Sequence, residues 1–177
     1  MKKIVALVLA LVMVLGCTAA LADTYGLGIS SSIGSSKDAA DGQDGKAQVD
    51  STVCALAVDA DGKIVSCLFD VAQTKIGFSA AGAITADKTA EVKSKQELGD
   101  EYGMRDSSGI KKEVGEQMTA LEDYLKGKTA ADAVATPTKQ RDEHHTRVPD
   151  VADLESNCTI DIGSFLDCLQ KAYDNAK

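Results

Sequence analysis

The chain has 177 residues, no tryptophan and a formal net charge of −8 at pH 7. This acidic balance argues against nucleic acid and anionic lipid as electrostatic partners, and its simplest interpretation is solubility. The chain is 44% hydrophobic, with four tyrosines and three phenylalanines as its aromatic residues, so its core must be mostly aliphatic.

The first 22 residues predict export. Lys2 and Lys3 precede an uncharged apolar run over residues 4–15, the pattern of a secretory signal peptide. The run is too short to span a membrane, which takes about 20 apolar residues. We expect an extracytoplasmic protein, either secreted or anchored to the outer face of the cytoplasmic membrane. Removing residues 1–22 leaves 155 residues, about one domain, and losing two lysines changes the net charge from −8 to −10.

Two processing sites compete within this segment. Small residues at Ala20 and Ala22 fit cleavage before Asp23, which releases a soluble domain. Residues 14–17, Val-Leu-Gly-Cys, resemble a lipobox, in which Cys17 becomes the acylated N-terminus of a lipoprotein. The sequence leaves both open, with a slight preference for the first.

The N-terminal part of the mature chain predicts one strand and one loop. Residues 24–34 mix glycine, serine and alternating aliphatic residues, which is typical of a strand with loose ends. Residues 36–50 are polar and contain two Asp-Gly pairs, so we expect a loop. We treat 23–50 as an N-terminal strand and loop that precede a domain over 51–177.

A β-hairpin is the clearest local signal. Residues 52–58 and 63–71 are β-rich runs joined by Asp-Ala-Asp-Gly, whose Gly62 can adopt the positive φ of a tight turn. Both runs are apolar at most positions, which indicates burial on both faces. A further run, 75–79, is expected to continue the meander.

Four cysteines follow the signal segment: Cys54, Cys67, Cys158 and Cys168. An even number outside the cytoplasm permits two disulfides. No pair has CxxC spacing, which argues against a zinc site. If Val58 pairs with Lys63, Cys54 and Cys67 lie directly opposite each other, whereas pairing of Asp59 with Lys63 puts them on opposite faces. The usual glycine-bulge turn gives the second register, so we favour two buried thiols there. For Cys158 and Cys168, a disulfide and a free core cysteine both stay open.

Helices dominate the C-terminal half. Residues 111–126 carry an apolar stripe that ends at Gly127, and Thr129 is placed to cap a short helix through residue 134. Residues 135–150 contain both prolines and many charges, and predict an exposed connection. A final amphipathic helix is expected over 161–175. Strands followed by helices, without alternation, predict an α+β fold: an antiparallel β-meander packed with C-terminal helices.

Enzymatic chemistry is not visible in the motifs. His144 and His145 are adjacent in a polar segment and cannot easily place both rings on one metal, so we interpret them as solvated loop residues. The chain has no phosphate-binding glycine motif of the P-loop or dinucleotide type. We therefore expect an electron carrier or a binding protein rather than a catalyst.

One polar turn stands out immediately before the final helix. It reads Asp-Leu-Glu-Ser-Asn-Cys-Thr over residues 153–159 and brings Thr159 near a helix N-terminus, where free N–H groups and the helix dipole favour a phosphate. The simpler interpretation is that Thr159 and Asp161 merely cap the helix.

This turn, together with the order of elements before it, resembles the FMN-binding domain of extracytoplasmic electron-transfer lipoproteins. In that family a D-x-x-S-G-A-T-x-[ST] motif precedes the last helix, and its threonine receives FMN through a phosphoester bond made by a flavin transferase. The resemblance implies Thr159 as the acceptor, Ser156 as the motif serine and Asp153 as the leading acid. Asn157 and Cys158 stand between them, where the family has Gly and Ala.

The resemblance implies a flavin-based electron carrier at the cell surface, with a flavin transferase and a membrane electron donor as partners. Three positions depart from the motif: Asn157, Cys158 and Asp161, the last an acid where a small hydroxyl residue is usual. Because glycine permits closer approach to a ligand and an acid opposes a phosphate, covalent FMN, non-covalent FMN and no flavin all remain open. The alternative function is a cell-surface binding module of the same fold without flavin.

Overall fold

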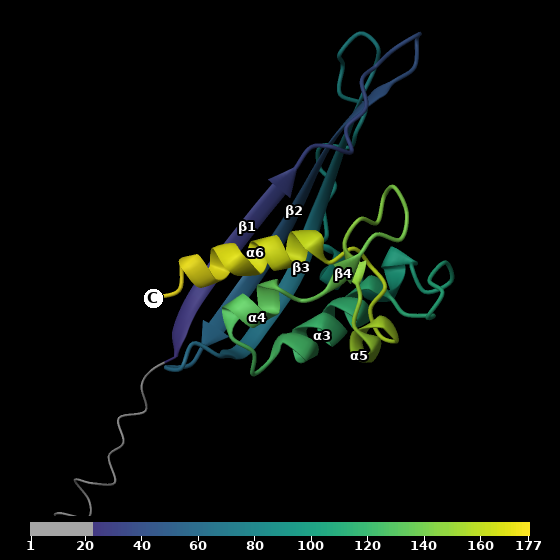
Figure 1. Ribbon diagram of the computed structural model, residues 1–177. Helices are drawn as coiled ribbons and strands as arrows, with labels where there is room; N and C mark the ends of the chain where they lie inside the picture. Colours follow the sequence, from purple (N-terminus) through teal and green to yellow (C-terminus); the bar gives the residue numbers. More distant parts are fainter. Residues whose placement is uncertain (1–22) are drawn as a thin grey trace, which may run out of the picture.

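The computed structural model describes residues 23–177, so the predicted signal peptide, with Cys17 and the possible lipobox, lies outside the described residues. An antiparallel three-stranded sheet forms the centre of the molecule, in the order β1-β2-β3 (Figure 1). Its strands are β1 (Thr24–Ser32), β2 (Gly45–Val58) and β3 (Ile64–Phe78). The chain is therefore α+β, as its sequence predicts.

Short and long helices follow the sheet in the chain. In order, the remaining elements are α2 (Lys95–Leu98), η1 (Gly99–Tyr102), α3 (Val114–Leu125), α4 (Ala130–Val134), β4 (Thr138–Lys139), β5 (Val148–Pro149), α5 (Ala152–Glu155) and α6 (Gly163–Asp174). The helices expected over 111–126, 129–134 and 161–175 are confirmed as α3, α4 and α6, and Thr129 caps α4 by accepting the N–H of Asp132. The segment 135–150 is not wholly exposed, because β4 pairs with β5 and Val148 is buried.

Helix α6 lies across one face of the sheet (Figure 1). Two glycines of β1 permit this close approach: a Cβ on Gly28 would collide with the carbonyl oxygen of Cys168, and one on Gly26 with that of Ala172. Phe165 of α6 packs edge-on against Phe69 of β3, with ring centroids 5.2 Å apart. The aliphatic core lies between this face, α6 and α3.

Helix α3 closes the outer edge of β3. Glu122 accepts the backbone N–H of Phe69 at 2.7 Å, and Ile64 exchanges backbone hydrogen bonds with the segment after α3, at Gly127 and Lys128. Gly127 has a φ of 77°, which ends the helix as its sequence predicts. Burial raises the pKa of Glu122 above its ordinary value, and the Phe69 N–H opposes that rise.

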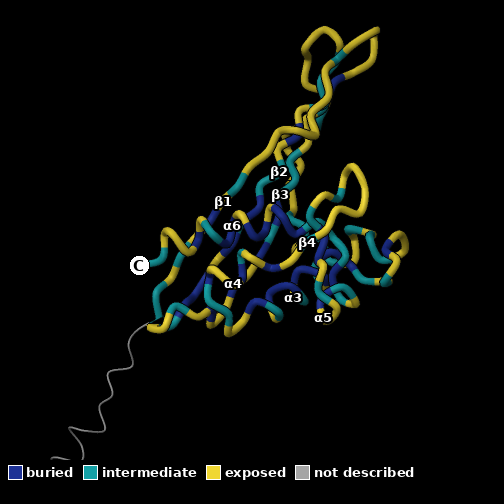
Figure 2. The backbone as a smooth tube through the Cα atoms, in the orientation of Figure 1, coloured by how far each residue is buried: buried dark blue, intermediate teal, exposed yellow. Residues whose placement is uncertain are grey.

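The sheet corrects three expectations. Strand β2 begins at Gly45, inside the predicted loop, and the run 75–79 is the end of β3 up to Phe78 rather than a separate strand. These additions form a long twisted arm that projects from the body and is largely exposed (Figures 1 and 2). Burial on both faces is also wrong, because Leu68 is 65% exposed on the face away from α6.

The hairpin register explains the state of two cysteines. A bulge at Ala57 and Val58 shifts the pairing, so that Cys54 lies opposite Phe69 and Cys67 opposite Leu56. Both cysteines therefore share the covered face instead of lying on opposite faces, which overturns that expectation. The expectation of two buried thiols is confirmed.

All four cysteines in the described residues are free and buried. The Cys168 thiol lies 3.3 Å from the carbonyl oxygen of Thr52, so it packs against the sheet instead of joining Cys158. Burial raises the pKa of Cys67 and of Cys158 to about 12. Thiols with such pKa values stay protonated at neutral pH and are poor nucleophiles.

Candidate functional site

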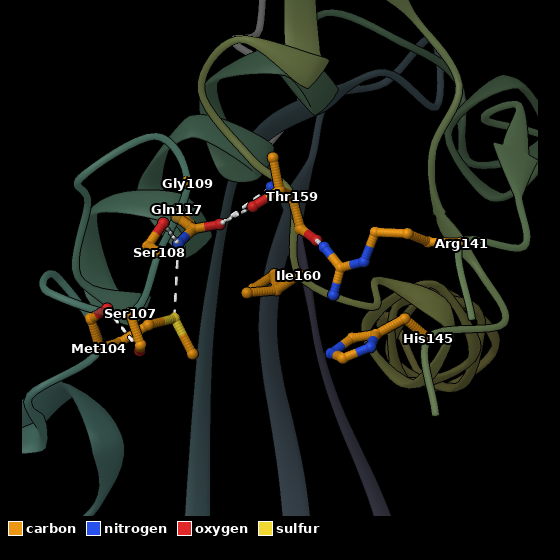
Figure 3. A pocket seen from close by; sticks show the side chains of 9 residues that line it. All are labelled: Met104, Ser107, Ser108, Gly109, Gln117, Arg141, His145, Thr159 and Ile160. Atoms are coloured by element: carbon orange, nitrogen blue, oxygen red, sulfur yellow. Dashed lines mark hydrogen bonds between the residues drawn. The ribbon is translucent and has the colours of Figure 1, made fainter. Parts of the chain in front are cut away.

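Thr159 lies between α5 and α6 and contributes to a hollow of about 340 Å³ (Figure 3). The nine side chains drawn in Figure 3 line it and come from the loop after η1, from α3, from the loop after β4 and from the turn at Thr159 itself. Met104 and Ile160 supply its apolar surface. Three loops and one helix therefore converge on the residue that the motif singles out.

Gln117 of α3 fixes Thr159. Its side chain is fully buried, and its amide oxygen accepts the backbone N–H of Thr159 at 2.9 Å and the Thr159 hydroxyl at 3.3 Å. The amide nitrogen donates to the carbonyl of Lys112 at 3.1 Å and reaches the Ser108 hydroxyl at 3.4 Å. The interactions on both ends of the amide hold its oxygen toward Thr159.

Two basic side chains form the opposite wall of the pocket (Figure 3). Arg141 donates from Nη1 to the carbonyl oxygen of Thr159 at 2.8 Å, and its side chain is 44% exposed. His145 lies beside it, with Nδ1 2.7 Å from the carboxylate of Asp142. Its imidazole ring is the main reason that the pKa of Asp142 lies well below the usual range.

The two histidines differ in environment. His144 is 82% exposed, as expected of a solvated loop residue, whereas His145 is half-buried and lines the pocket. Sequence reasoning missed the contributions of Gln117, Arg141 and His145 to this pocket. A signal for Gln117 was present, because it lies three residues after Val114 and four before Leu121, on the apolar stripe of the helix.

The other predicted site residues do not gather around Thr159. Asp153 and Ser156 are exposed on and after α5, and Asp153 and Asn157 line a different hollow. Asn157 accepts a hydrogen bond from Lys112 at 2.6 Å, and Cys158 is fully buried in the core. Of the predicted residues, Thr159 alone lines the pocket with Gln117, Arg141 and His145.

The departures from the motif are accommodated structurally. Asn157 does not have a positive φ, so the position demands no glycine. Asp161 does not bond to Thr159; its carboxylate accepts the backbone N–H groups of Arg147 and of Gly163, both at 2.9 Å. The N-cap of α6 is Ile162, which makes no side-chain cap bond, so the expectation that Thr159 and Asp161 cap this helix is wrong, although Asp161 accepts the N–H of Gly163, its first residue. The positive charge beside Thr159 comes from Arg141.

Two kinds of feature, a metal-binding cluster and a membrane-spanning helix, were sought among the described residues. Over residues 23–177, no group of three or more histidine, cysteine or acidic side chains is placed to hold a metal ion. Within the same range, no helix is both long and apolar enough for a membrane span.

Comparison with known proteins gives one distant relative. A chlorophenol reductase from Desulfitobacterium hafniense is 30% identical over an alignment 165 positions long, and the match covers 71% of this chain and 50% of the reductase. The chain therefore spans about half the length of the curated relative that it matches. No family model and no solved structure matches the chain.

Proposed function

We propose that the pocket at Thr159 binds FMN by its phosphate and that the protein is a redox carrier. The observation that carries this proposal is the guanidinium of Arg141 beside Thr159, in a chain whose net charge is −8. A basic wall in an acidic protein favours an anionic ligand. The resemblance of residues 153–159 to the flavin-attachment motif supplies the identity of that anion.

The residues present fit the phosphate end of FMN. Arg141 donates from Nη1 to Thr159 and pairs through Nε with the Asp142 carboxylate at 3.3 Å, and the side chain is 44% exposed, so its Nη2 group can bind phosphate oxygens. Ser107 and Ser108 add hydroxyl groups on the other wall, and Met104 and Ile160 add apolar surface for a ring system. The volume of about 340 Å³ lies at the lower end of ordinary ligand pockets, about 300–1,000 Å³.

In this proposal each residue has a distinct role. Gln117 orients the Thr159 hydroxyl through the 3.3 Å hydrogen bond, and the fully buried amide cannot turn away without losing its partners. Arg141 neutralises phosphate charge. FMN, when bound, would supply the exchange of one or two electrons. The reductase named among the relatives supports a redox role of this kind, although the chain covers half of that protein.

A second candidate function is a binding module of the same fold without covalent flavin. It is favoured by the hydrogen bond that the Thr159 hydroxyl donates to the Gln117 amide oxygen, because a phosphoester at Thr159 would remove this donor. The two candidates differ in whether Thr159 is modified, so a mass measurement separates them.

The proposal includes export of the protein and lipid attachment at Cys17. It also includes a flavin transferase and a membrane electron donor as partners. A tethered domain would meet a membrane donor repeatedly, whereas a domain released at Asp23 would fit a binding module better. N-terminal mass analysis of the processed protein distinguishes an acylated Cys17 from a free Asp23.

A titration tests the phosphate end of the proposal. Apoprotein made without a flavin transferase is titrated with FMN and with riboflavin, which lacks the phosphate, and binding is followed by flavin fluorescence. We expect FMN to bind at least tenfold more tightly than riboflavin, and Arg141→Ala to remove most of that difference. Equal affinities for the two flavins would contradict a phosphate site at Arg141.

A further inference from the structure

The sheet face opposite α6 is uncovered and apolar. We call it the open sheet face: the side chains of β1, β2 and β3 that alternate with those facing α6, centred on Leu27, Ala55 and Leu68. Leu27 and Ile29 are each 53% exposed, Leu68 is 65% exposed and Tyr25 is 67% exposed. Isolated exposed leucines are ordinary, but a contiguous face of this kind marks an interaction site.

This face is almost free of charge. Among its described side chains, Asp70 is the one that carries a charge, although 26% of the chain is charged. The Asp70 carboxylate accepts the N–H of Val71 at 2.7 Å and that of Gln96 at 3.1 Å. Gln96 belongs to α2, beside the β3 edge, so the single charge is engaged at the border of the face.

At both edges of the sheet body, backbone groups already have hydrogen-bond partners. Another molecule would therefore contact the sheet through its open face rather than through an edge. On the β1 side, Tyr25 exchanges both backbone hydrogen bonds with Lys177, and Asn175 donates to the carbonyl of Leu27. On the β3 side, Glu122 and the segment after α3 take the free backbone groups. Addition of a foreign strand at either edge of the body would have to displace these partners.

We propose that the open sheet face is a homodimer interface in which two copies pack sheet against sheet. The register places Ala55 between Leu27 on β1 and Leu68 on β3, so the small side chain on the central strand leaves a hollow between two leucines. A leucine of one copy fits the hollow of another, and twisted sheets pack face to face with an angle of about 30°. This surface is complementary to itself.

The size of the face is suited to a dimer. The 14 residues of β2, at about 3.3 Å each, give a length of about 45 Å, and three strands about 4.8 Å apart give a width of about 15 Å. With the shorter β1, the projected area is on the order of 600 Å². Stable interfaces bury about 800 Å² of accessible surface per partner, which a face of this size approaches.

Charge favours a second copy over a partner of opposite charge. Two processed molecules of net charge −10 repel each other except where charge has been removed from the contact, as it has here. A basic partner would need acids to pair with, and Asp70 is already engaged. The inference does not depend on flavin binding.

Sedimentation equilibrium on the processed protein tests the proposal. We expect a reversible dimer, and Leu68→Lys should weaken it at least tenfold because a charge enters the dry contact. Val92→Lys is the matched control: Val92 is 51% exposed but lies outside the sheet, and this change should leave the dimer intact. A monomer at every concentration overturns the proposal, as does a dimer that Leu68→Lys leaves unchanged in a variant with wild-type circular dichroism.

A cross-link provides a second test that does not destabilise the fold. Ala55→Cys puts a thiol at the centre of the face, while the four native thiols are buried. A short bis-maleimide should give a cross-linked dimer with Ala55→Cys, because packed sheets lie about 10 Å apart, and none with Ala131→Cys, an exposed position of α4. Equal cross-linking of the two variants would contradict a contact through this face.

Discussion

The sheet with α6 and the pocket at Thr159 are built in different ways. Between the sheet and α6, backbones approach so closely that Gly26 and Gly28 have no room for a side chain. Around Thr159, three loops meet one helix, and the side chains of Arg141 and His145 are partly exposed. Gln117 joins the two regions, because it is buried in α3 and bonds to Thr159.

The difference separates stability from binding. Substitutions under α6 should change the free energy of unfolding. In the fraction of protein that folds, they should leave the affinity of the pocket for FMN unchanged. Substitutions on the basic wall should do the reverse. Four variants test this division, in order of falling effect on stability.

Gly28→Val should have the largest effect. Its Cβ would overlap the carbonyl oxygen of Cys168, so α6 must move off the sheet, and we expect a loss of about 3 kcal/mol or more. Urea unfolding followed by circular dichroism measures it. Gly34→Ala is the control, since its added Cβ meets Ser32 at an ordinary 3.4 Å. Wild-type stability in Gly28→Val would show that α6 is not held closely against β1.

Gln117→Leu should cost about 1–3 kcal/mol, because the Thr159 N–H loses its acceptor in a partly buried setting. Thr119→Ala, on the exposed side of the same helix, should change stability by less than about 0.5 kcal/mol. Hydrogen exchange of the Thr159 amide should also accelerate in Gln117→Leu. Unchanged exchange at that amide would be inconsistent with the role given to Gln117.

Glu122→Gln should stabilise the protein slightly at neutral pH, because it removes the cost of keeping a buried carboxyl group ionised. Burial raises the pKa of Glu122 in the folded state, so the unfolded chain loses this proton first. Wild-type stability at this group therefore falls as pH rises from the ordinary glutamate pKa toward the raised one. The glutamine retains the acceptor for Phe69 without that penalty.

Urea unfolding at pH 4 and pH 7 measures the effect of Glu122→Gln. The advantage of the variant should shrink at pH 4, where the wild-type carboxyl is largely protonated in both states. Glu143→Gln, whose side chain is 86% exposed, should show no such pH dependence. An advantage that is larger at pH 4 would reverse the sign expected from burial.

Arg141→Ala should change stability least, by less than about 0.5 kcal/mol, because its contacts are partly exposed. The same variant should bind FMN about tenfold more weakly, with Arg141→Lys intermediate because it keeps the charge and loses the fork. Isothermal titration gives both affinities. If Arg141→Ala binds FMN as tightly as the wild-type protein, Arg141 does not contribute to FMN binding.

The helices were more predictable than the sheet. Helix α3 and its end at Gly127 follow from the local apolar stripe and a glycine with positive φ, and the Thr129 cap of α4 is equally local. The open sheet face was not predictable, because an apolar run such as residues 63–71 predicts a strand but not what covers it. The bulge at Ala57 and Val58 lies outside the turn residues from which the register was predicted.

For the candidate site, the sequence singled out Thr159 but not the residues around it. Gln117 and Arg141 are 42 and 18 residues away along the chain, and nothing local connects them to that threonine. Asp153 and Ser156 were named from the motif, and the structure places them on a surface away from the pocket. The motif thus identified one residue of the candidate pocket, whereas the packing of loops distant in sequence determines which residues surround it.

The most direct test of the account is the intact mass of the protein co-expressed with a flavin transferase. We expect the wild-type chain to gain the mass of one FMN less one water and to absorb in the flavin range, and Thr159→Ala to stay at the unmodified mass. Flavin retained covalently by Thr159→Ala would place the attachment elsewhere. A colourless wild-type protein at the unmodified mass that also fails to bind added FMN would contradict the proposed flavin site.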